Sequence, residues 1–148
     1  MSPKPVGVPG LQRVSGILTR QDEIQKSLEE LRSTIPGVEA AVLSTFDGLV
    51  LAASSSLAEE TSKLAALGAA MLSLSQRVGQ TYGVGDPQEV DLNGSEGRVI
   101  FFRVAGRAIL VVSATINPAA GVNMGLVLLE SRNFVQKLTR RLEATSRS

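Results

Sequence analysis

Two apolar runs in the second half of the chain, Arg98 to Val104 and Arg107 to Ala114, constrain the fold more than any other feature. Each has the length of a strand and is nearly continuous in Val, Ile, Leu, Phe and Ala, which is typical of strands covered on both faces. Only the turn-prone pair Ala105-Gly106 separates them. We therefore expect two central strands of one sheet.

Three further segments have the pattern of strands. The runs Val38 to Ser44 and Leu49 to Ala53 flank Asp47-Gly48, a pair suited to a tight turn, so they predict a β-hairpin. The segment Glu89 to Leu92 alternates apolar with charged residues. Such alternation indicates a strand with one solvated face, and we expect this strand at an edge of the sheet.

Three segments carry apolar residues at helical spacing. Thr19 is a candidate N-cap for the first helix, and Pro36 and Gly37 stop it after Ile35. Ser56 followed by Glu59 has the capping-box pattern and opens the second helix. The three helices are expected at about 19–35, 56–82 and 124–142, so the element order is αββαβββα, an α/β chain of the α+β type.

The length of 148 residues suits one domain. Three of the six prolines lie in the first nine residues, so we expect an irregular N-terminal arm over residues 1–18 and the domain over residues 19–148. The arm is either a frayed tail or a segment that docks on a partner.

The chain has no His and no Cys. This excludes Ser-His-Asp and Cys-His relays, disulfides and the usual thiolate or imidazole metal sites, so we expect no enzyme activity, no cofactor and no bound metal. A net charge of +1 is far from the basic excess of a nucleic-acid binder. No apolar stretch approaches the roughly 20 residues of a membrane span, and no apolar signal core opens the chain, so we expect a cytoplasmic protein.

The segment Gly83-Val84-Gly85-Asp86 is the nearest approach to a phosphate-binding loop. It follows a helix instead of joining a strand to a helix, and it lacks the third glycine and any accompanying Lys motif. It is therefore expected to end the second helix. We expect the chain alone neither to hydrolyse nor to bind nucleotide tightly.

The second helix has two apolar stripes, although a helix with one buried face needs only one. The first stripe is expected to cover the sheet and consists of Leu57, Leu64, Met71, Leu72, Val78 and Tyr82. The second consists of Leu67, Ala70, Leu74 and Thr81, with Gly68, Ala69 and Ser73 nearby. These small residues either allow a second helix to approach closely or are good helix formers on a solvated face.

The element order and several local strings resemble the roadblock family, which comprises dynein roadblock-type light chains and prokaryotic regulators of Ras-like GTPases. The strings are Ile35-Pro36-Gly37-Val38, Ser44 to Leu51, the alanine-rich second helix and Asn123-Met124-Gly125-Leu126. The resemblance covers roughly Gln21 to Leu142. The prokaryotic branch is the better likeness, because the eukaryotic light chains are shorter and lack an N-terminal arm.

The resemblance implies a roadblock- or profilin-like fold: one antiparallel sheet in the order 2-1-5-4-3 between the long second helix and the other two helices. It also implies a homodimer in which second helices pack together and third strands pair. Carried over by position, the interface residues are Leu67, Ala70, Leu74, Val90, Asp91 and Leu92.

On this resemblance the dimer is a non-catalytic regulator or scaffold that binds a small Ras-like GTPase. The residues expected at the margin of the helix pair, where the partner would bind, are Lys63, Ala66, Ala69 and Arg77. The alternative is a small-molecule sensing or general protein-assembly module of similar fold, and sensing would require an enclosed pocket with convergent polar groups.

Overall fold

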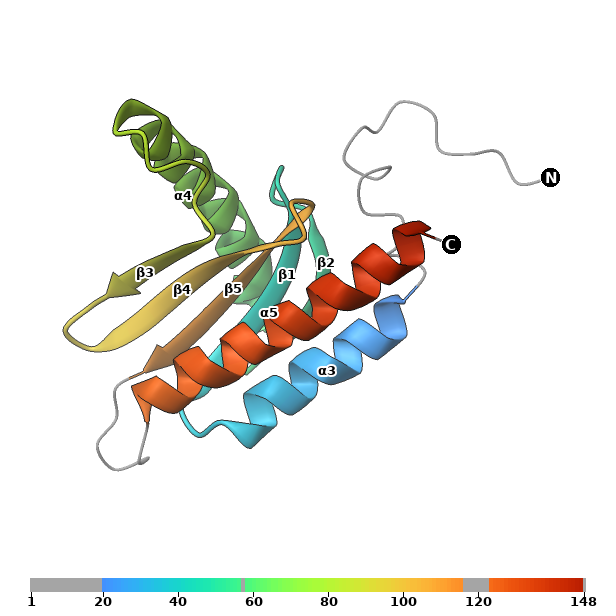
Figure 1. Ribbon diagram of the computed structural model, residues 1–148. Coiled ribbons are helices and arrows are strands. Elements are labelled where there is room, and N and C mark those ends of the chain that lie inside the picture. The colour runs from blue at the N-terminus through green and yellow to red at the C-terminus, as the bar shows by residue number, and fades with distance from the viewer. Residues whose placement is uncertain (1–19, 57, 116–122, 148) are drawn as a thin grey trace.

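The computed structural model describes residues 20–56, 58–115 and 123–147. Five strands form one antiparallel sheet in the order β2-β1-β5-β4-β3 (Figure 1), which confirms the predicted order. Strands β4 and β5 lie inside the sheet and β3 lies at an edge, as predicted. The strands are β1 (Val38–Thr45), β2 (Val50–Ser55), β3 (Glu89–Asn93), β4 (Gly97–Val104) and β5 (Ala108–Thr115).

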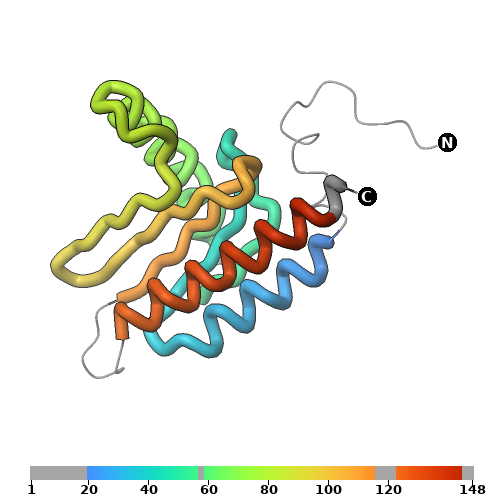
Figure 2. Tube along the Cα trace, in the orientation of Figure 1, coloured from blue at the N-terminus to red at the C-terminus, as the bar shows by residue number. Residues whose placement is uncertain are grey.

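Helices cover both faces of this sheet. On one face α3 (Gln21–Thr34) and α5 (Met124–Arg147) lie side by side, and on the other face lies α4 (Thr61–Thr81), which a short 3-10 turn, η1 (Ala58–Glu60), precedes. The chain trace in Figure 2 shows that the end of α4 and the loop to β3 stand out from the sheet. The expected N-terminal arm lies outside the described residues.

The two faces of the sheet carry separate apolar cores. The larger core lies toward α3 and α5 and includes the fully buried Leu28, Leu43, Leu110 and Leu142. The smaller core lies toward α4 and is formed by Val42, Ala65, Leu72, Phe101, Ile109 and Val111. Alternate residues of the central strands therefore contribute to opposite cores, which explains why their apolar runs are nearly continuous.

Both predicted hairpin turns are present. Around Asp47-Gly48, the backbone N–H of Thr45 donates to the carbonyl of Leu49 at 2.9 Å, and the Gly48 N–H donates to the carbonyl of Thr45 at 3.1 Å. The pair Ala105-Gly106 has positive φ at both residues, the geometry of a two-residue hairpin turn.

The two helix starts differ from the prediction. Helix α3 begins at Gln21 with Arg20 in the cap position, where its side chain makes no capping hydrogen bond, and the predicted cap Thr19 lies outside the described residues. Helix α4 begins at Thr61 with Glu60 in the cap position, and the capping box does not form. Its expected first residue, Ser56, instead donates its backbone N–H to the carbonyl of Glu39 at 3.1 Å, which extends the β1–β2 pairing. Strand pairing therefore takes this residue away from the helix.

The face of α4 that meets the sheet also differs from the prediction. Its buried residues are Ala65, Gly68, Leu72 and Gly79, and Leu64 and Met71 pack beside them. Val78 and Tyr82 were expected on this face, but 51% and 77% of their surface is exposed. The side chain of Leu57 lies outside the described residues. The missing side chain of Gly68 lets the helix backbone approach Val111 of the sheet closely, whereas Gly79 packs against Gly85 in the loop that follows the helix. Several large side chains of α4 point outward.

Candidate interaction surface

The outward side of α4 carries large apolar side chains in water. Leu67, Leu74 and Val78 are 61%, 58% and 51% exposed. Their spacings of seven and four residues place them on one stripe, opposite the buried side of the helix. Ala70 lies beside them and is also exposed. A stripe of this kind on a monomer marks a surface that associates with another protein.

The apolar surface continues onto the sheet. Helix α4 packs mainly on β1, β5 and β2, so it leaves the same face of β3 and β4 less covered. Val90 and Val99 are half-buried against the smaller core, and Leu92, two residues after Val90 and therefore on the same face, is 53% exposed. We call the set Leu67, Ala70, Leu74, Val78, Val90 and Leu92 the α4–β3 surface.

The outer edge of β3 is open for strand pairing. The carbonyl of Gln88 and the N–H of Gly94 bond to β4, so the alternating pattern points the backbone groups of Glu89, Asp91 and Asn93 outward. Within the described part of the chain, no backbone hydrogen bond to these outward groups is recorded. An open edge beside an apolar face is well suited to adding a strand from another molecule.

The loop after α4 borders a hollow of about 380 Å³ beside Leu74 and Val78. The helix ends with a Schellman motif: Gly83 has φ of 70°, a value that favours glycine, and the N–H of Val84 donates to the carbonyl of Gly79 at 2.9 Å. This turn leaves Val84 77% exposed at the rim of the hollow.

Arg103 of β4 anchors the same loop to the sheet. Its Nη1 lies 3.5 Å from a carboxylate oxygen of Asp86 in the loop, and its guanidinium carbon lies 5.4 Å from the ring centre of Phe46. The ring and the carboxylate together hold this largely buried cation.

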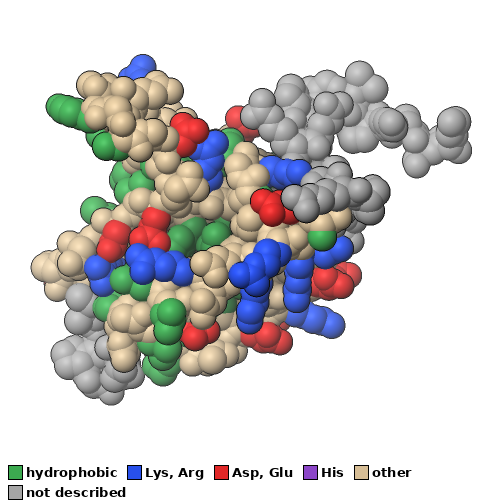
Figure 3. Space-filling view, in the orientation of Figure 1, with side chains coloured by type: hydrophobic (Ala, Val, Ile, Leu, Met, Phe, Trp, Pro, Cys, Tyr) green, Lys and Arg blue, Asp and Glu red, His purple; other side chains and the backbone are tan. Residues whose placement is uncertain are grey.

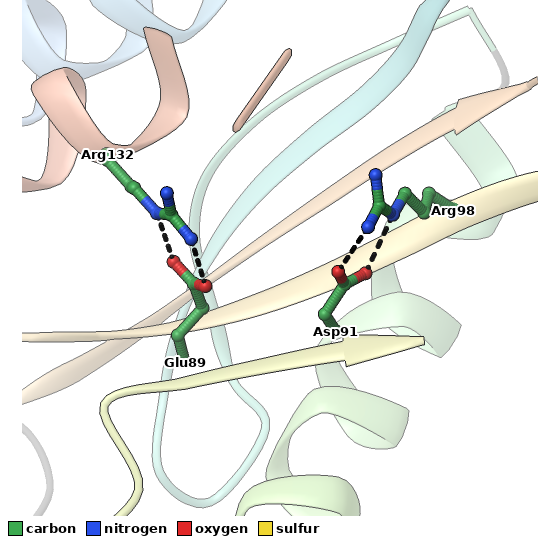
Figure 4. A network of polar contacts seen from close by, with 4 residues as sticks. All are labelled: Glu89, Asp91, Arg98 and Arg132. Carbon is green, nitrogen blue, oxygen red and sulfur yellow. Dashed lines mark hydrogen bonds and ion pairs between the residues drawn. The ribbon is translucent and has the colours of Figure 1, made fainter. Parts of the chain in front are cut away.

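Two ion pairs stabilise β3 on the face opposite α4 (Figure 4). Arg132 of α5 donates two hydrogen bonds to the carboxylate of Glu89, at 2.8 and 2.7 Å. Arg98 of β4 binds Asp91 in the same two-pronged way, at 3.1 and 2.7 Å. The side chain of Asp91 therefore points toward the α5 side of the sheet, and only its backbone faces the open edge. Paired guanidinium and carboxylate groups fix the position of an otherwise exposed edge strand.

Loss of the Glu89–Arg132 pair should lower stability in a pH-dependent way. Hydrogen bonds from Arg132 hold the pKa of Glu89 below its ordinary value, with a smaller opposing effect of burial. A carboxyl whose pKa falls on folding stabilises the fold above its unfolded pKa, and this contribution disappears as pH drops through the folded pKa. Glu89→Gln should therefore lower the thermal midpoint at pH 7 by about 1–3 °C, a surface-pair effect.

Thermal melts between pH 7 and pH 3 check this expectation. The difference between wild type and Glu89→Gln should shrink as the pH falls, because the wild-type carboxyl then loses its charge as well. Glu96→Gln, at an exposed position in the β3–β4 turn, serves as the control. A difference that stays constant over the whole pH range would contradict the role of this pair.

The residues predicted at the margin of the helix pair do not share one environment. Lys63 is exposed and its Nζ lies 3.7 Å from a carboxylate oxygen of Glu60, while Ala66 and Arg77 are also exposed. Ala69 is half-buried and packs against the smaller core. Three of the four therefore lie on the outward side of α4, and Ala69 lies toward the sheet.

Sequence reasoning missed part of the exposed apolar surface. Val78, Tyr82 and Val84 were not predicted to be exposed, yet all three are. The available signal was the pair of small residues Ala65 and Gly68, which lie on one face of the helix and allow close packing on the sheet.

The opposite face of the molecule has a different character. Lys, Arg, Asp and Glu side chains gather along α3 and α5 (Figure 3). An open groove of about 230 Å³ between these helices is lined by residues such as Glu30, Asn133, Phe134 and Lys137.

Among the described residues, no group of His, Cys, Asp and Glu is arranged to hold a metal ion. In the same described ranges, no helix is both long and apolar enough to cross a bilayer.

Comparisons with solved structures find proteins of similar fold. The Roadblock/LC7 domain from Streptomyces avermitilis matches with a TM-score of 0.69 and 22% identity, covering 80% of this chain and 97% of that one. MglB of Myxococcus xanthus matches with a TM-score of 0.70 and 18% identity, covering 86% and 90%. Acanthamoeba castellanii profilin IA matches with a TM-score of 0.55 and 15% identity, covering 79% and 97%.

A comparison with curated protein sequences finds no match. The family model described as the Roadblock/LC7 domain matches residues 24–114, which is more than half of the chain. These residues run from the first buried position of α3 to the penultimate residue of β5 and so include the α4–β3 surface. The chain therefore belongs to the Roadblock/LC7 domain family.

Proposed function

We propose that this protein is a non-catalytic homodimer that binds a small Ras-like GTPase and acts as its regulator or scaffold. The observation that carries the proposal is the α4–β3 surface, where a row of exposed leucine and valine side chains adjoins an open strand edge. Membership of the Roadblock/LC7 family supports the regulator or scaffold class over an enzyme.

A two-fold symmetric dimer would bury both features at once. In such a dimer the α4 stripes of two copies face each other, and the two β3 edges pair as antiparallel strands. Asp91 is the middle residue of the outward-facing set on β3, so the symmetry axis would pass near it. Five strands from each copy then form one continuous sheet, with the paired α4 helices lying across it.

This helix pair would offer a broad, nearly rigid platform for the GTPase. Lys63 and Arg77 lie on the outward side of α4, near the expected margin of the helix pair. Charges at such a margin mainly change the association rate and its salt dependence. A GTPase whose contact surface is acidic is therefore the partner that this platform would attract.

Arg77→Glu is expected to weaken capture of the GTPase about tenfold or more while leaving the dimer intact, because it reverses one charge at each of two symmetric positions. The measurement is a pull-down with Ras-like GTPases from the same genome, each loaded with GDP or with a slowly hydrolysed GTP analogue. Capture should depend on the nucleotide. Arg140→Glu, the same change at an exposed position on α5, is the control and should bind as wild type does.

Two outcomes would contradict the proposal. If wild-type protein captures no GTPase in either nucleotide state, the alternative of a sensing or general assembly module becomes the better explanation. If Arg77→Glu and Arg140→Glu weaken capture equally, the partner does not bind beside α4.

A further inference from the structure

The two edges of the sheet, β2 and β3, differ in how their outward backbone groups are satisfied. These strands lie at opposite ends of the sheet order. An exposed edge strand presents unpaired N–H and C=O groups that invite pairing with another chain. The β3 edge is open, whereas side chains from α3 occupy the β2 edge.

Glutamine side chains form this covering. The side-chain amide of Gln25 makes two hydrogen bonds with the backbone of Ala53. Its Oε1 accepts from the Ala53 N–H at 3.1 Å, and its Nε2 donates to the Ala53 carbonyl. One turn earlier, Gln21 donates from Nε2 to the carbonyl of Leu51 at 2.8 Å. A primary amide offers the same donor and acceptor as a peptide group, so Gln25 occupies the place of a residue in an added strand.

The Gln25 amide is held in this orientation by a further contact. Its Nε2 also donates to a carboxylate oxygen of Glu29, one turn along the same helix, at 3.1 Å. Farther along α3, Nε of Arg32 donates to the hydroxyl of Ser54 at 2.8 Å. Contacts from three positions along α3 therefore run along β2.

We propose that Gln21 and Gln25 close the β2 edge to a second copy of this chain, so that self-association by strand pairing is confined to β3. An assembly with one usable edge closes at two copies. With both edges usable, dimers would join through β2 into an open chain of continuous sheet. This inference rests on the proposed homodimer. It adds a reason why association would stop at two copies.

The test first removes the glutamine side chains from the β2 edge and then blocks the same edge with a proline. The double variant Gln21→Ala/Gln25→Ala leaves the outward groups of Leu51 and Ala53 available to another strand. Sedimentation should show a weight-average mass that rises with concentration to at least about twofold that of wild type. Gln136→Ala, at an exposed glutamine on α5, is the matched control and should keep the wild-type mass.

Adding Ala53→Pro to the double variant should restore the wild-type mass. The N–H of Ala53 points away from β1, so proline removes no bond of the existing sheet, yet it takes away a donor that a new strand needs. A folded double variant with wild-type mass would overturn the proposal. So would a heavier double variant that Ala53→Pro fails to return to the wild-type mass.

Circular dichroism establishes that each variant is folded. If the double variant does not fold, Gln25→Ala alone is used, because Gln21 then still bonds Leu51. It should show a smaller rise in mass, and no rise would count against the proposal. A wild-type monomer would refute the proposed dimer, but the change in mass on opening β2 would still decide this inference.

Discussion

Leu74→Glu is expected to dissociate the proposed dimer, raising its dissociation constant by about 100-fold or more. Leu74 is 58% exposed on the outward stripe of α4, near the centre of the proposed contact. In a two-fold dimer the substitution appears twice, so two carboxylates would replace two leucines in an apolar contact and would have to be desolvated there. Sedimentation across micromolar concentrations measures the effect.

Leu129→Glu is a matched control for this prediction. Leu129 is 55% exposed, close to the value for Leu74, but it lies on α5 on the opposite face of the sheet. The control variant should associate as wild type does. A wild-type monomer, or a Leu74→Glu variant that dimerises as tightly as Leu129→Glu, would contradict the assignment of the dimer contact to α4.

Gly68→Leu is expected to lower the free energy of unfolding by about 2–4 kcal/mol through overpacking. A Cβ atom at Gly68 would lie 2.8 Å from Cγ2 of Val111 and 3.7 Å from both Cγ2 of Ile109 and Cδ1 of Phe101. The branched Val111 side chain is fully buried on a central strand and has little freedom to move away. Leucine is a far better helix former than glycine, but that gain of about 1 kcal/mol is smaller than the cost of separating α4 from the sheet.

Urea unfolding measures this change. Ser73→Leu, at an exposed position on the same helix, introduces the same side chain away from the sheet and should change stability by no more than about 0.5 kcal/mol. Equal stability of Gly68→Leu and wild type would mean that α4 does not depend on this close approach to the sheet.

The two substitutions examine opposite sides of one helix. Gly68 allows α4 to lie close to β5, and large residues on other sides of the helix, including Leu74 and Val78, point into solvent. A helix whose small residues face its own sheet therefore creates an apolar outer surface. The orientation of α4 on the sheet therefore decides both how the helix packs and which apolar residues are available for the proposed contact with a second copy.

Much of the fold was predictable from local patterns. The strands between 98 and 114, the hairpin around Asp47-Gly48 and the end of α4 near Tyr82 each follow from a short stretch of sequence, because apolar runs and turn residues act locally. The central positions of β4 and β5 followed from their composition, and the complete strand order also required the family resemblance. The predicted capping box of the second helix was wrong, since Ser56 extends the β1–β2 pairing instead of capping the helix.

The candidate surface was predictable only in part. Leu67 and Leu74 were placed on a second stripe, beyond the one that covers the sheet, and both are exposed. Leu92 was expected on the apolar side of an alternating strand and was named as an interface residue only through the family resemblance, yet it is 53% exposed. Val78 and Tyr82 were assigned to the sheet because helical periodicity gives the angle between residues but not which side faces the core. The contact of Gln25 with the β2 edge was not anticipated, since 28 positions in the sequence separate Gln25 from Ala53 and no local pattern links them.

The sequence by itself determined the element order, the turns and the lack of His and Cys chemistry, because these depend on residue type and short-range spacing. The tertiary structure decided which side of α4 is buried, which edge of the sheet is open and where each ion pair forms. Those properties depend on how closely distant segments approach one another. That distance depends on the size of the side chains that lie between the segments, and not on either segment alone. At Gly68, for example, the lack of a Cβ atom lets α4 lie close to the sheet.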